Sequence, residues 1–515
     1  MWSLISRSQR LIKLLMGFRR YSKSSSTGQQ QRARRALMQQ FADARGITMK
    51  VGQLIAAASG SDDELSPLIS SIEPLPLKQV LPGIEQALGC HWNKVFNTID
   101  ESSAAASLGQ VHHATLLSGE EVAVKVQYPG IDVAIEAEMR LLGLLPKAGP
   151  VKRWQFDLDA YRLALQKNMQ AELDYRHEAS EQLYFSDHLI LSGVVIPKVY
   201  ENLSSKTLLV QSWEDGDYLK SVANWTQPAR IEIAKTLLGV LLKSLFQIRR
   251  LHADPHMGNS YFRYHAEQGI EMVLMDFGCT IAITEQQSLA LLKLIIASKE
   301  KLAISPLKFF VAMGFDAQKL KRIEAYLPKL CEYLFSPFNA DTTFELQQWL
   351  LAKKITNLLA EQRWWFRSAG PAELIFIMRA FQGLVQQLQL LKVDINWWQI
   401  LSQNIPDELM HKARNFECAD IEPEANARPL TIESIASTLK VKISRHGVTK
   451  VEIELPAEAA LELDAFIPEN IQLKLKDSSD INLQQIQRQV RNSGIASQLL
   501  FDFEADESRY QVWLE

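Results

Sequence analysis

The sequence has little cysteine, and the cysteines are not spaced to form a structural site. Its 515 residues include four, Cys90, Cys279, Cys331 and Cys418, and none belongs to a CxxC pair. Such scattered cysteines argue against a disulfide framework and against a zinc site. They are typical of a protein in a reducing compartment.

Long apolar runs and a strong net charge are also missing. No stretch reaches about 18 uninterrupted apolar residues, the usual length of a membrane-spanning helix. The best candidate, residues 289–297, is short and is broken by Lys293. The formal net charge of -3 excludes a nucleic-acid-binding protein by overall charge. Hydrophobic residues make up 47% of the chain, which is typical of a globular protein, and the length allows about two to four domains.

Positive charge is concentrated near the start of the sequence. Residues 1–23 alternate cations with apolar side chains at roughly helical spacing, which predicts a basic amphipathic helix on an anionic membrane surface. An Arg-rich organellar presequence and a solvated tail without a partner remain alternatives. Residues 1–45 contain one acid, Asp43, and these basic residues: Arg7, Arg10, Lys13, Arg19, Arg20, Lys23, Arg32, Arg34, Arg35 and Arg45.

Composition and periodicity predict an α+β chain of five segments. The first is the basic segment and its polar linker, and the second is a helical extension. The third contains strands with a helical insertion, the fourth is almost all helical, and the last is a small α/β appendage. Their predicted bounds are 1–31, 32–102, 103–217, 218–419 and 420–515.

The finer pattern places several elements within these segments. A strand–turn–strand pattern begins at residue 103 and ends at 126, and a helical stretch covers 158–189. Strands are predicted near 194–199 and 207–212, followed by an apolar helix over 231–250. The appendage is expected to contain two strands, a helix and a further polar strand.

The first chemical motif is Asp276-Phe277-Gly278, which follows an apolar strand. In kinases an Asp at this place coordinates the Mg²⁺ that is bound to the nucleotide phosphates, and the Gly allows the backbone to turn. Alone, the tripeptide is a weak signal that a turn at the end of a strand would also explain.

The upstream segment HADPHMGN argues against a simple turn at the end of a strand. It contains Asp254 and, five residues later, Asn259, which lies 17 residues before Asp276. A kinase catalytic loop uses an Asp at the nucleophile and an Asn at this spacing for the metal. We therefore predict Asp254 as the catalytic carboxylate, and Asn259 and Asp276 as Mg²⁺ ligands. His252 and His256 are interpreted as residues that order the loop, since Mg²⁺ prefers oxygen.

A strand and a small-residue turn complete the nucleotide motif. The strand EVAVKV carries Lys125, at the place from which a kinase lysine reaches the phosphates. One hairpin earlier, AAASLGQV stands where a kinase has its Gly-rich loop; small side chains let backbone N–H groups approach phosphate, and alanine makes the loop stiffer than glycine would. The predicted nucleotide-binding residues in this turn are Ala104, Ala105, Ala106, Ser107, Gly109 and Gln110.

The segment WEDG after the strand near 207–212 is typical of the hinge between two lobes. Backbone groups near Gln211 and Trp213 are expected to read the adenine ring.

Taken in order, KVGQ, AAASLGQVH, VAVKVQYPG, ELDYRHEA, HADPHMGN and DFG resemble the UbiB/AarF family of atypical kinases, over roughly residues 46–390. The resemblance implies a bilobal protein-kinase-like fold with an alanine-rich nucleotide loop. It also implies a helical KxGQ segment over the cleft where a protein kinase would admit its peptide. Carried over by position, it implies a pair between Lys125 and Glu178, and two KxGQ residues facing two acids across the pocket: Lys50 and Gln53 opposite Glu172 and Asp174.

Two features depart from the family pattern. Met257 stands where the family usually has Pro, so the loop loses one fixed φ, while Asp254 and Asn259 are intact. Some bacterial relatives end in transmembrane helices, whereas this chain ends in the polar appendage. Membrane attachment is therefore expected to come from the N-terminal helix or from a partner.

The resemblance implies ATP and Mg²⁺ as cofactors and a role in ubiquinone or other isoprenoid-quinone biosynthesis at a membrane. The main hypothesis is an ATP-dependent kinase or ATPase whose partners are a lipid or quinone precursor, the membrane surface and quinone-biosynthesis enzymes. It would act in the cytoplasm at the inner membrane, or in mitochondria or plastids. A nucleotide-gated lipid-binding or scaffold protein is the first alternative. A protein kinase is the second alternative. It is less favoured, because the KxGQ segment should obstruct the cleft that would bind a peptide substrate.

Overall fold

The computed structural model describes residues 74–106, 108–133, 135, 154–254, 257–265, 269–419, 436, 438–446, 448–463, 482–493, 498–505 and 508–515. The basic N-terminal segment, Lys50, Gln53 and Ser107 lie outside these residues. The chain divides into two compact units: the first comprises Met1–Gly143 and Ala160–Asp420, and the second comprises Leu144–Asp159 and Ile421–Glu515. Each unit is described separately.

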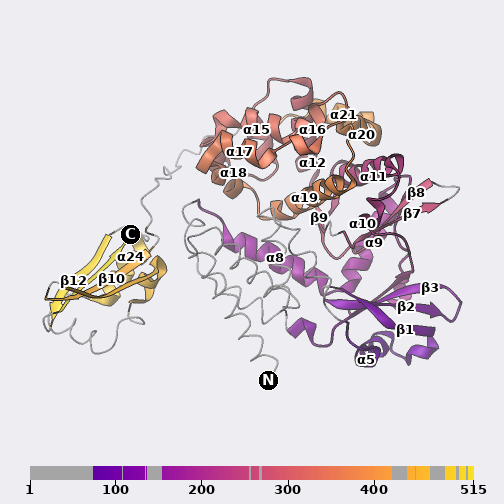
Figure 1. Cartoon of the computed structure of the whole chain (residues 1–515), viewed down its shortest axis with the longest axis horizontal. Coiled ribbons are helices and arrows are strands. Elements are labelled where there is room, and N and C mark those ends of the chain that lie inside the picture. The colour runs from indigo at the N-terminus through magenta and orange to yellow at the C-terminus, as the bar shows by residue number, and fades with distance from the viewer. Residues whose placement is uncertain are drawn as a thin grey trace. The chain divides into compact units, whose positions relative to one another are not determined.

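The first unit begins with an antiparallel sheet in the order β1-β2-β3-β5. Its strands are β1 (Phe96–Ala105), β2 (Gly109–Leu116), β3 (Glu121–Gln127) and β5 (Leu208–Ser212). Alternating apolar side chains from β2, β3 and β5 cover one face of the sheet, and helix α5 (Leu77–Leu88) buries Val80 and Ile84 against them. Figure 1 shows α5 beside these indigo and violet strands.

Strand β1 corrects the predicted boundary of the helical extension. It begins at Phe96, inside the segment that was predicted to stay helical to residue 102. Most of its side chains are exposed and polar, so the sequence carries no alternating apolar signal there. The strand forms because it pairs with β2, from Phe96 opposite Leu116 to Ala105 opposite Gln110.

Two helices, α8 (Leu158–Glu172) and α9 (Tyr175–His188), account for the helical stretch predicted over 158–189. The break between them lies at Leu173 and Asp174. Asp174 is the N-cap of α9, and its carboxylate accepts a hydrogen bond from the Arg176 backbone N–H at 3.1 Å. This break lets the two helices take different directions, so the acids at the end of α8 and the start of α9 face one site.

The rest of the first unit is mainly helical, as predicted. Short strands lie at its start: β4 (Val194–Val195) pairs in parallel with β8 (Gly269–Leu274), β8 pairs with β7 (Ser260–His265), and β6 (Arg250–His252) pairs with β9 (Thr280–Ala282). The helices are α10 (Leu219–Val222), α11 (Gln227–Phe246), α12 (Glu285–Glu300), α13 (Pro306–Ala312), α14 (Ala317–Lys321), α15 (Leu327–Leu334), α16 (Ser336–Asn339), α17 (Leu351–Leu359), α18 (Arg363–Ala369), α19 (Leu374–Leu391), α20 (Trp397–Asn404) and α21 (Asp407–Arg414).

The helix predicted over 231–250 ends earlier than expected. α11 stops at Phe246, and Arg250 already belongs to β6, where it pairs with Ala282. The chain turns at Arg249, which has a positive φ of 54°. This turn delivers the next residues, the predicted catalytic loop, to the site.

Helix α19 is the one helix in the described part of the chain that is long and apolar enough to cross a membrane, judged by length and composition only. It packs against α11 and buries Phe376, Arg379, Leu384 and Leu388. A helix that buries an arginine among apolar residues within a unit behaves as a core helix.

The second unit is a four-stranded antiparallel sheet in the order β11-β10-β13-β12. Its elements are β10 (Thr438–Arg445), β11 (Val448–Pro456), α24 (Leu483–Ser493), β12 (Gln498–Ala505) and β13 (Ser508–Leu514). Leu439, Phe501, Val512 and Leu514 form its core together with Val490 of α24. The predicted two strands and helix are therefore present, and the predicted final strand is a hairpin.

Candidate active site

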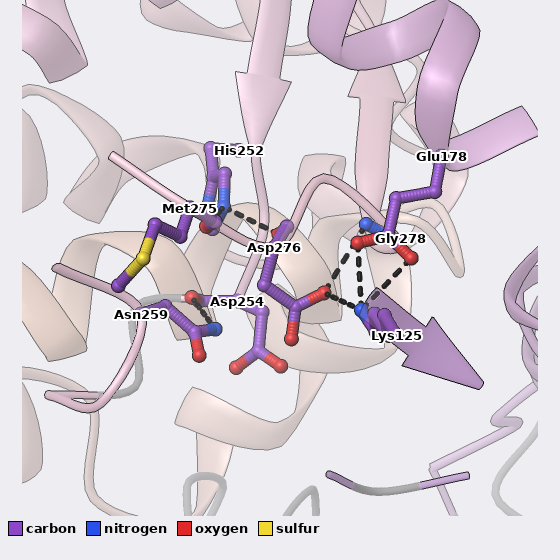
Figure 2. Close-up of polar contacts among 8 residues, drawn as sticks. All are labelled: Lys125, Glu178, His252, Asp254, Asn259, Met275, Asp276 and Gly278. Atoms are coloured by element: carbon purple, nitrogen blue, oxygen red, sulfur yellow. Dashed lines mark hydrogen bonds and ion pairs between the residues drawn. The ribbon is translucent and has the colours of Figure 1, made fainter. Parts of the chain in front are cut away.

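A buried lysine at the centre of the first unit binds two acids. Lys125 of β3 donates to both carboxylate oxygens of Glu178 in α9, at 2.6 and 2.9 Å, and to Oδ1 of Asp276 at 3.3 Å (Figure 2). The side chain of Glu178 is 3% exposed, whereas that of Asp276 is 36% exposed. The pair between Lys125 and Glu178 that the resemblance implied is present. Glu178 thus contacts the lysine from the protein interior, and Asp276 contacts it from the side that faces solvent.

The charges around this lysine are unbalanced toward the negative. Burial lowers the pKa of Lys125, but the charges of Asp276 and Glu178 outweigh it and hold that pKa well above its usual value. Burial also raises the pKa of Glu178 above that of an ordinary glutamate, although Lys125 opposes this. Glu172, at the end of α8, is 6% exposed and adds a third negative charge near Glu178. Three acids around one ammonium group make a site that attracts a cation.

The backbone at Asp276 holds its carboxylate in place. Asp276 has a positive φ of 62°, a conformation that aspartate tolerates better than most residues. The ring of His252 lies within hydrogen-bonding distance of the Asp276 carbonyl, at 2.8 Å. Phe277 is fully buried between His252 and Phe185 of α9, with ring centroids 5.5 and 5.0 Å away. His252 therefore orders the loop, as predicted; His256 lies outside the described residues.

Gly278 is small because three acids converge on it. A Cβ atom there would lie 3.3 Å from Oδ1 of Asp276 and 3.7 Å from both Glu172 Cγ and Glu178 Oε2. A side chain would crowd these carboxylates. Packing against the Asp276 carboxylate thus favours glycine at this position of the DFG motif.

The predicted catalytic loop lies beside the lysine. Asn259 donates from Nδ2 to the Asp254 carbonyl at 3.1 Å, which fixes the orientation of its amide. In Figure 2 the carboxylates of Asp254 and Asp276 and the amide of Asn259 point toward the same side of the site. The Asp254 carboxylate, 11% exposed, also accepts a hydrogen bond from Arg379 of α19 at 2.6 Å. No sequence motif marks Arg379 as a residue of the site.

The oxygen atoms of this arrangement suit Mg²⁺. Asp276 and Asn259 supply a carboxylate and an amide oxygen, which are hard ligands of the kind that Mg²⁺ prefers. No group of three or more His, Cys, Asp or Glu side chains is arranged as a metal site in the part of the chain that the structure describes. The residues therefore fit a metal that nucleotide phosphates and water help to coordinate, rather than a metal held by protein alone.

The alanine-rich segment forms the tight turn between β1 and β2. Ala104 and Ala105 are exposed at the end of β1, and the Ala106 N–H donates to the Gly109 carbonyl at 2.8 Å. Leu108, in contrast, is buried in the core. The turn therefore presents Ala104 and Ala105 outward, as a nucleotide-binding loop requires.

Gly109 and Gln110 make contacts that support the sheet. A Cβ atom on Gly109 would lie 2.1 Å from the Val126 carbonyl oxygen, so glycine is there because β3 passes too close for a side chain. Gln110 is fully buried, and its amide exchanges hydrogen bonds with the Leu75 backbone N–H and C=O, both at 2.8 Å. It also contacts His112 at 2.8 Å. Both residues thus have a structural role, and their contact with nucleotide stays a prediction.

The hinge differs from its prediction in detail. The Trp213 N–H donates to the Glu121 carbonyl at 3.1 Å, and Gln211 pairs with Ala123 across the sheet, so these groups are used within the sheet. The chain then crosses to Asp217, which pairs with Phe262 of β7. Adenine recognition by backbone groups near Gln211 and Trp213 stays a prediction.

The acids of the ELDYRHEA segment separate into two roles. Glu172 is buried beside Gly278, within the site. Asp174 caps α9 and forms an ion pair with Arg176 at 2.6 Å, and the hydrogen bond from Arg176 lowers the pKa of Asp174. Asp174 thus has a structural role in the described residues. The opposing Lys50 and Gln53 lie outside them, so the arrangement of the KxGQ segment stays a prediction.

Comparisons with known proteins agree with this geometry. Residues 67–302 match the ABC1 atypical kinase-like domain. The chain is 31% identical over 242 residues to a mitochondrial atypical kinase, COQ8B, of Danio rerio. This alignment covers 45% of this chain and 38% of that protein. It is 34% identical over 223 residues to a chloroplastic aarF domain-containing protein kinase of Arabidopsis thaliana, covering 42% and 30%. The matches thus span well under half the length of these relatives.

A solved structure supports the fold. The structure of Rv3197 in complex with erythromycin, from Mycobacterium tuberculosis, superposes with a TM-score of 0.51 at 23% identity and covers 73% of this chain and 96% of that one. The resemblance to the UbiB/AarF family and the kinase-like α+β fold are confirmed. Residues 67–302 thus resemble an ABC1 atypical kinase-like domain.

Proposed function

We propose that this protein is an ATP-dependent atypical kinase or ATPase that supports ubiquinone or other isoprenoid-quinone biosynthesis. The observation that carries the proposal is the contact of Lys125 with Glu178 and Asp276, beside Asp254 and Asn259. Phosphoryl transfer needs a cation for the phosphates, oxygen ligands for Mg²⁺ and a carboxylate at the nucleophile. This site contains all three.

In this proposal each residue has a separate task. Lys125, held by Glu178, contacts the nucleotide phosphates, and Asp276 and Asn259 hold Mg²⁺. Bound Mg²⁺ would neutralise negative charge on the phosphates. Asp254 orients the nucleophile, which is a water molecule or a hydroxyl group. The Ala104 to Ala106 turn covers the phosphates with its backbone.

The relatives suggest where this chemistry is used. The COQ8B kinase of Danio rerio is mitochondrial and the aarF domain kinase of Arabidopsis thaliana is chloroplastic. These names favour the mitochondrial or plastid alternative over the cytoplasm. We propose peripheral attachment to a membrane through residues 1–23, and a lipid or quinone precursor, with the biosynthetic enzymes, as partners. A nucleotide-gated lipid-binding or scaffold protein and a protein kinase remain the alternatives.

The experiment that tests the proposal is to follow the γ-phosphate of labelled ATP. The protein is incubated with Mg²⁺ and ATP, with and without liposomes that contain quinone-precursor mimics. Label released as phosphate supports an ATPase, and label on the lipid supports a lipid kinase. Label on protein alone would favour a protein kinase, and no turnover despite tight nucleotide binding would favour the scaffold alternative.

A further inference from the structure

Helix α19 reaches the site from a part of the chain beyond residue 302, where the family match ends. Its Arg379 donates from Nη2 to Oδ1 of Asp254 at 2.6 Å, across 125 residues of sequence. The two side chains are 10% and 11% exposed. A pair this short and this buried is held in one geometry, because little water competes for either charge.

An apolar contact fixes α19 at the same place. Phe376 is buried against Ala253 and Cys279, the residues that precede Asp254 and follow Gly278. The Ala253 N–H donates to the Cys279 carbonyl at 2.9 Å, so the catalytic loop and the end of the DFG segment are joined beneath Phe376. Phe376 and Arg379 are three residues apart and share one face of the helix. That face contacts the loop with a ring and with a guanidinium group.

The ion pair restricts what the Asp254 carboxylate can do. The hydrogen bond from Arg379 to Oδ1 restricts the rotation of the Asp254 carboxyl group. The surroundings make a partner necessary: Glu172, Glu178 and Asp276 already place three acids around Lys125. A further carboxylate, nine-tenths buried, needs a cation close by.

We propose that Arg379 is a positioning residue that orients Asp254 for phosphoryl transfer. This inference rests on the proposed function, because it concerns the orientation of the same carboxylate. Arg379 touches neither nucleotide nor nucleophile in this proposal; it acts through Asp254. Removing it should slow the chemical step, since small displacements of a reacting group have large effects on rate. It should leave nucleotide binding at Lys125 nearly unchanged.

The test compares Arg379→Gln and Arg379→Lys with the wild-type protein in Mg²⁺-dependent ATP turnover. We expect Arg379→Gln to lower kcat by about 10- to 100-fold and to change the KM for ATP by less than about threefold. Lysine keeps the charge but not the planar fork, so Arg379→Lys should recover part of the rate. In Asp254→Asn, adding Arg379→Gln should lower kcat little further, because both changes affect one carboxylate.

Arg230 of α11 provides a matched control, because it contacts the C-terminal end of α19. Its Nη1 donates to the Leu391 carbonyl at 2.5 Å, where α19 ends. Arg230→Gln should loosen α19 and lower the unfolding temperature while kcat stays near the wild-type value. An equal loss of kcat in Arg230→Gln, or additive effects of Arg379→Gln and Asp254→Asn, would overturn the positioning role and leave a structural one.

The outcomes separate the two proposals. If the wild-type protein turns ATP over, Asp254→Asn does not, and Arg379→Gln retains the wild-type kcat, only the role of Arg379 is overturned. If the wild-type protein shows no Mg²⁺-dependent turnover, the proposed function fails and the role of Arg379 fails with it.

Discussion

Replacing Gln110 with alanine separates the structural account of this residue from the sequence-based one. The sequence predicted that Gln110 binds nucleotide, whereas the structure buries it completely, in contact with Leu75 and His112. The substitution removes two hydrogen bonds to the Leu75 backbone and the contact with the buried His112 ring. We therefore expect a loss of stability rather than of nucleotide affinity.

The size of the effect follows from the burial of each group. An orphaned buried polar group such as the His112 ring nitrogen costs about 1–3 kcal/mol. Leu75 is half-buried, so each of its two lost bonds costs about 0.5–1.5 kcal/mol, since water replaces part of the interaction. The free energy of unfolding should fall by about 2–6 kcal/mol in total, which is a large part of the stability of an ordinary domain.

The assay is urea unfolding of Gln110→Ala, with Gln211→Ala on β5 of the same sheet as the control that should change stability by less than about 0.5 kcal/mol. ADP affinity is measured in parallel, under conditions in which both variants are folded. Unchanged unfolding together with a tenfold weaker affinity would refute our assignment and restore Gln110 to the nucleotide site.

Three further predictions test other parts of the account. Gly109→Ala should destabilise the protein by about 3 kcal/mol or more in urea unfolding, because its Cβ would overlap the Val126 carbonyl. Gly83→Ala is the control: it has space for a Cβ atom and should stabilise helix α5 by about 0.5–1 kcal/mol. Equal effects of the two substitutions would contradict the close approach of β3 to Gly109. Burial lowers the pKa of His112 below its ordinary 6.5, so the unfolded chain binds the proton first and stability should fall as pH drops below about 6.5; a His112→Gln variant with the same pH dependence would exclude this histidine as the cause. Deleting residues 1–23 should abolish flotation with anionic liposomes, and full-length binding should weaken as salt rises; flotation of both proteins would place the attachment surface elsewhere.

The sequence predicted the part of the site that depends on local spacing. Asp254 and Asn259 lie five residues apart, and the β7–β8 hairpin connects Asn259 to Asp276, so local spacing was enough to predict their mutual positions. Lys125 could be predicted because it lies in a strand with a clear alternation. Glu178 depended on the family resemblance, since nothing in the local pattern of α9 distinguishes it.

The parts that the sequence did not predict depend on contacts between distant segments. Gly109 and Gln110 stand beside the alanine run, and only the passage of β3 and the return of Leu75 show that they support the sheet. Strand β1 could not be found because its exposed polar side chains have no apolar periodicity. Arg379 is a single cation in an apolar helix 125 residues from Asp254, and no sequence pattern connects the two.

The central claim is that the first unit binds Mg²⁺ and ATP at Asp276 and turns the nucleotide over. The most direct measurement is Mg²⁺-dependent release of γ-phosphate by the wild-type protein and by Asp276→Asn, with circular dichroism to show that both are folded. The account predicts turnover by the wild-type protein and loss of at least about a hundredfold in the variant, because the charged oxygen ligand of the metal is removed. Turnover of Asp276→Asn at the wild-type rate would contradict it.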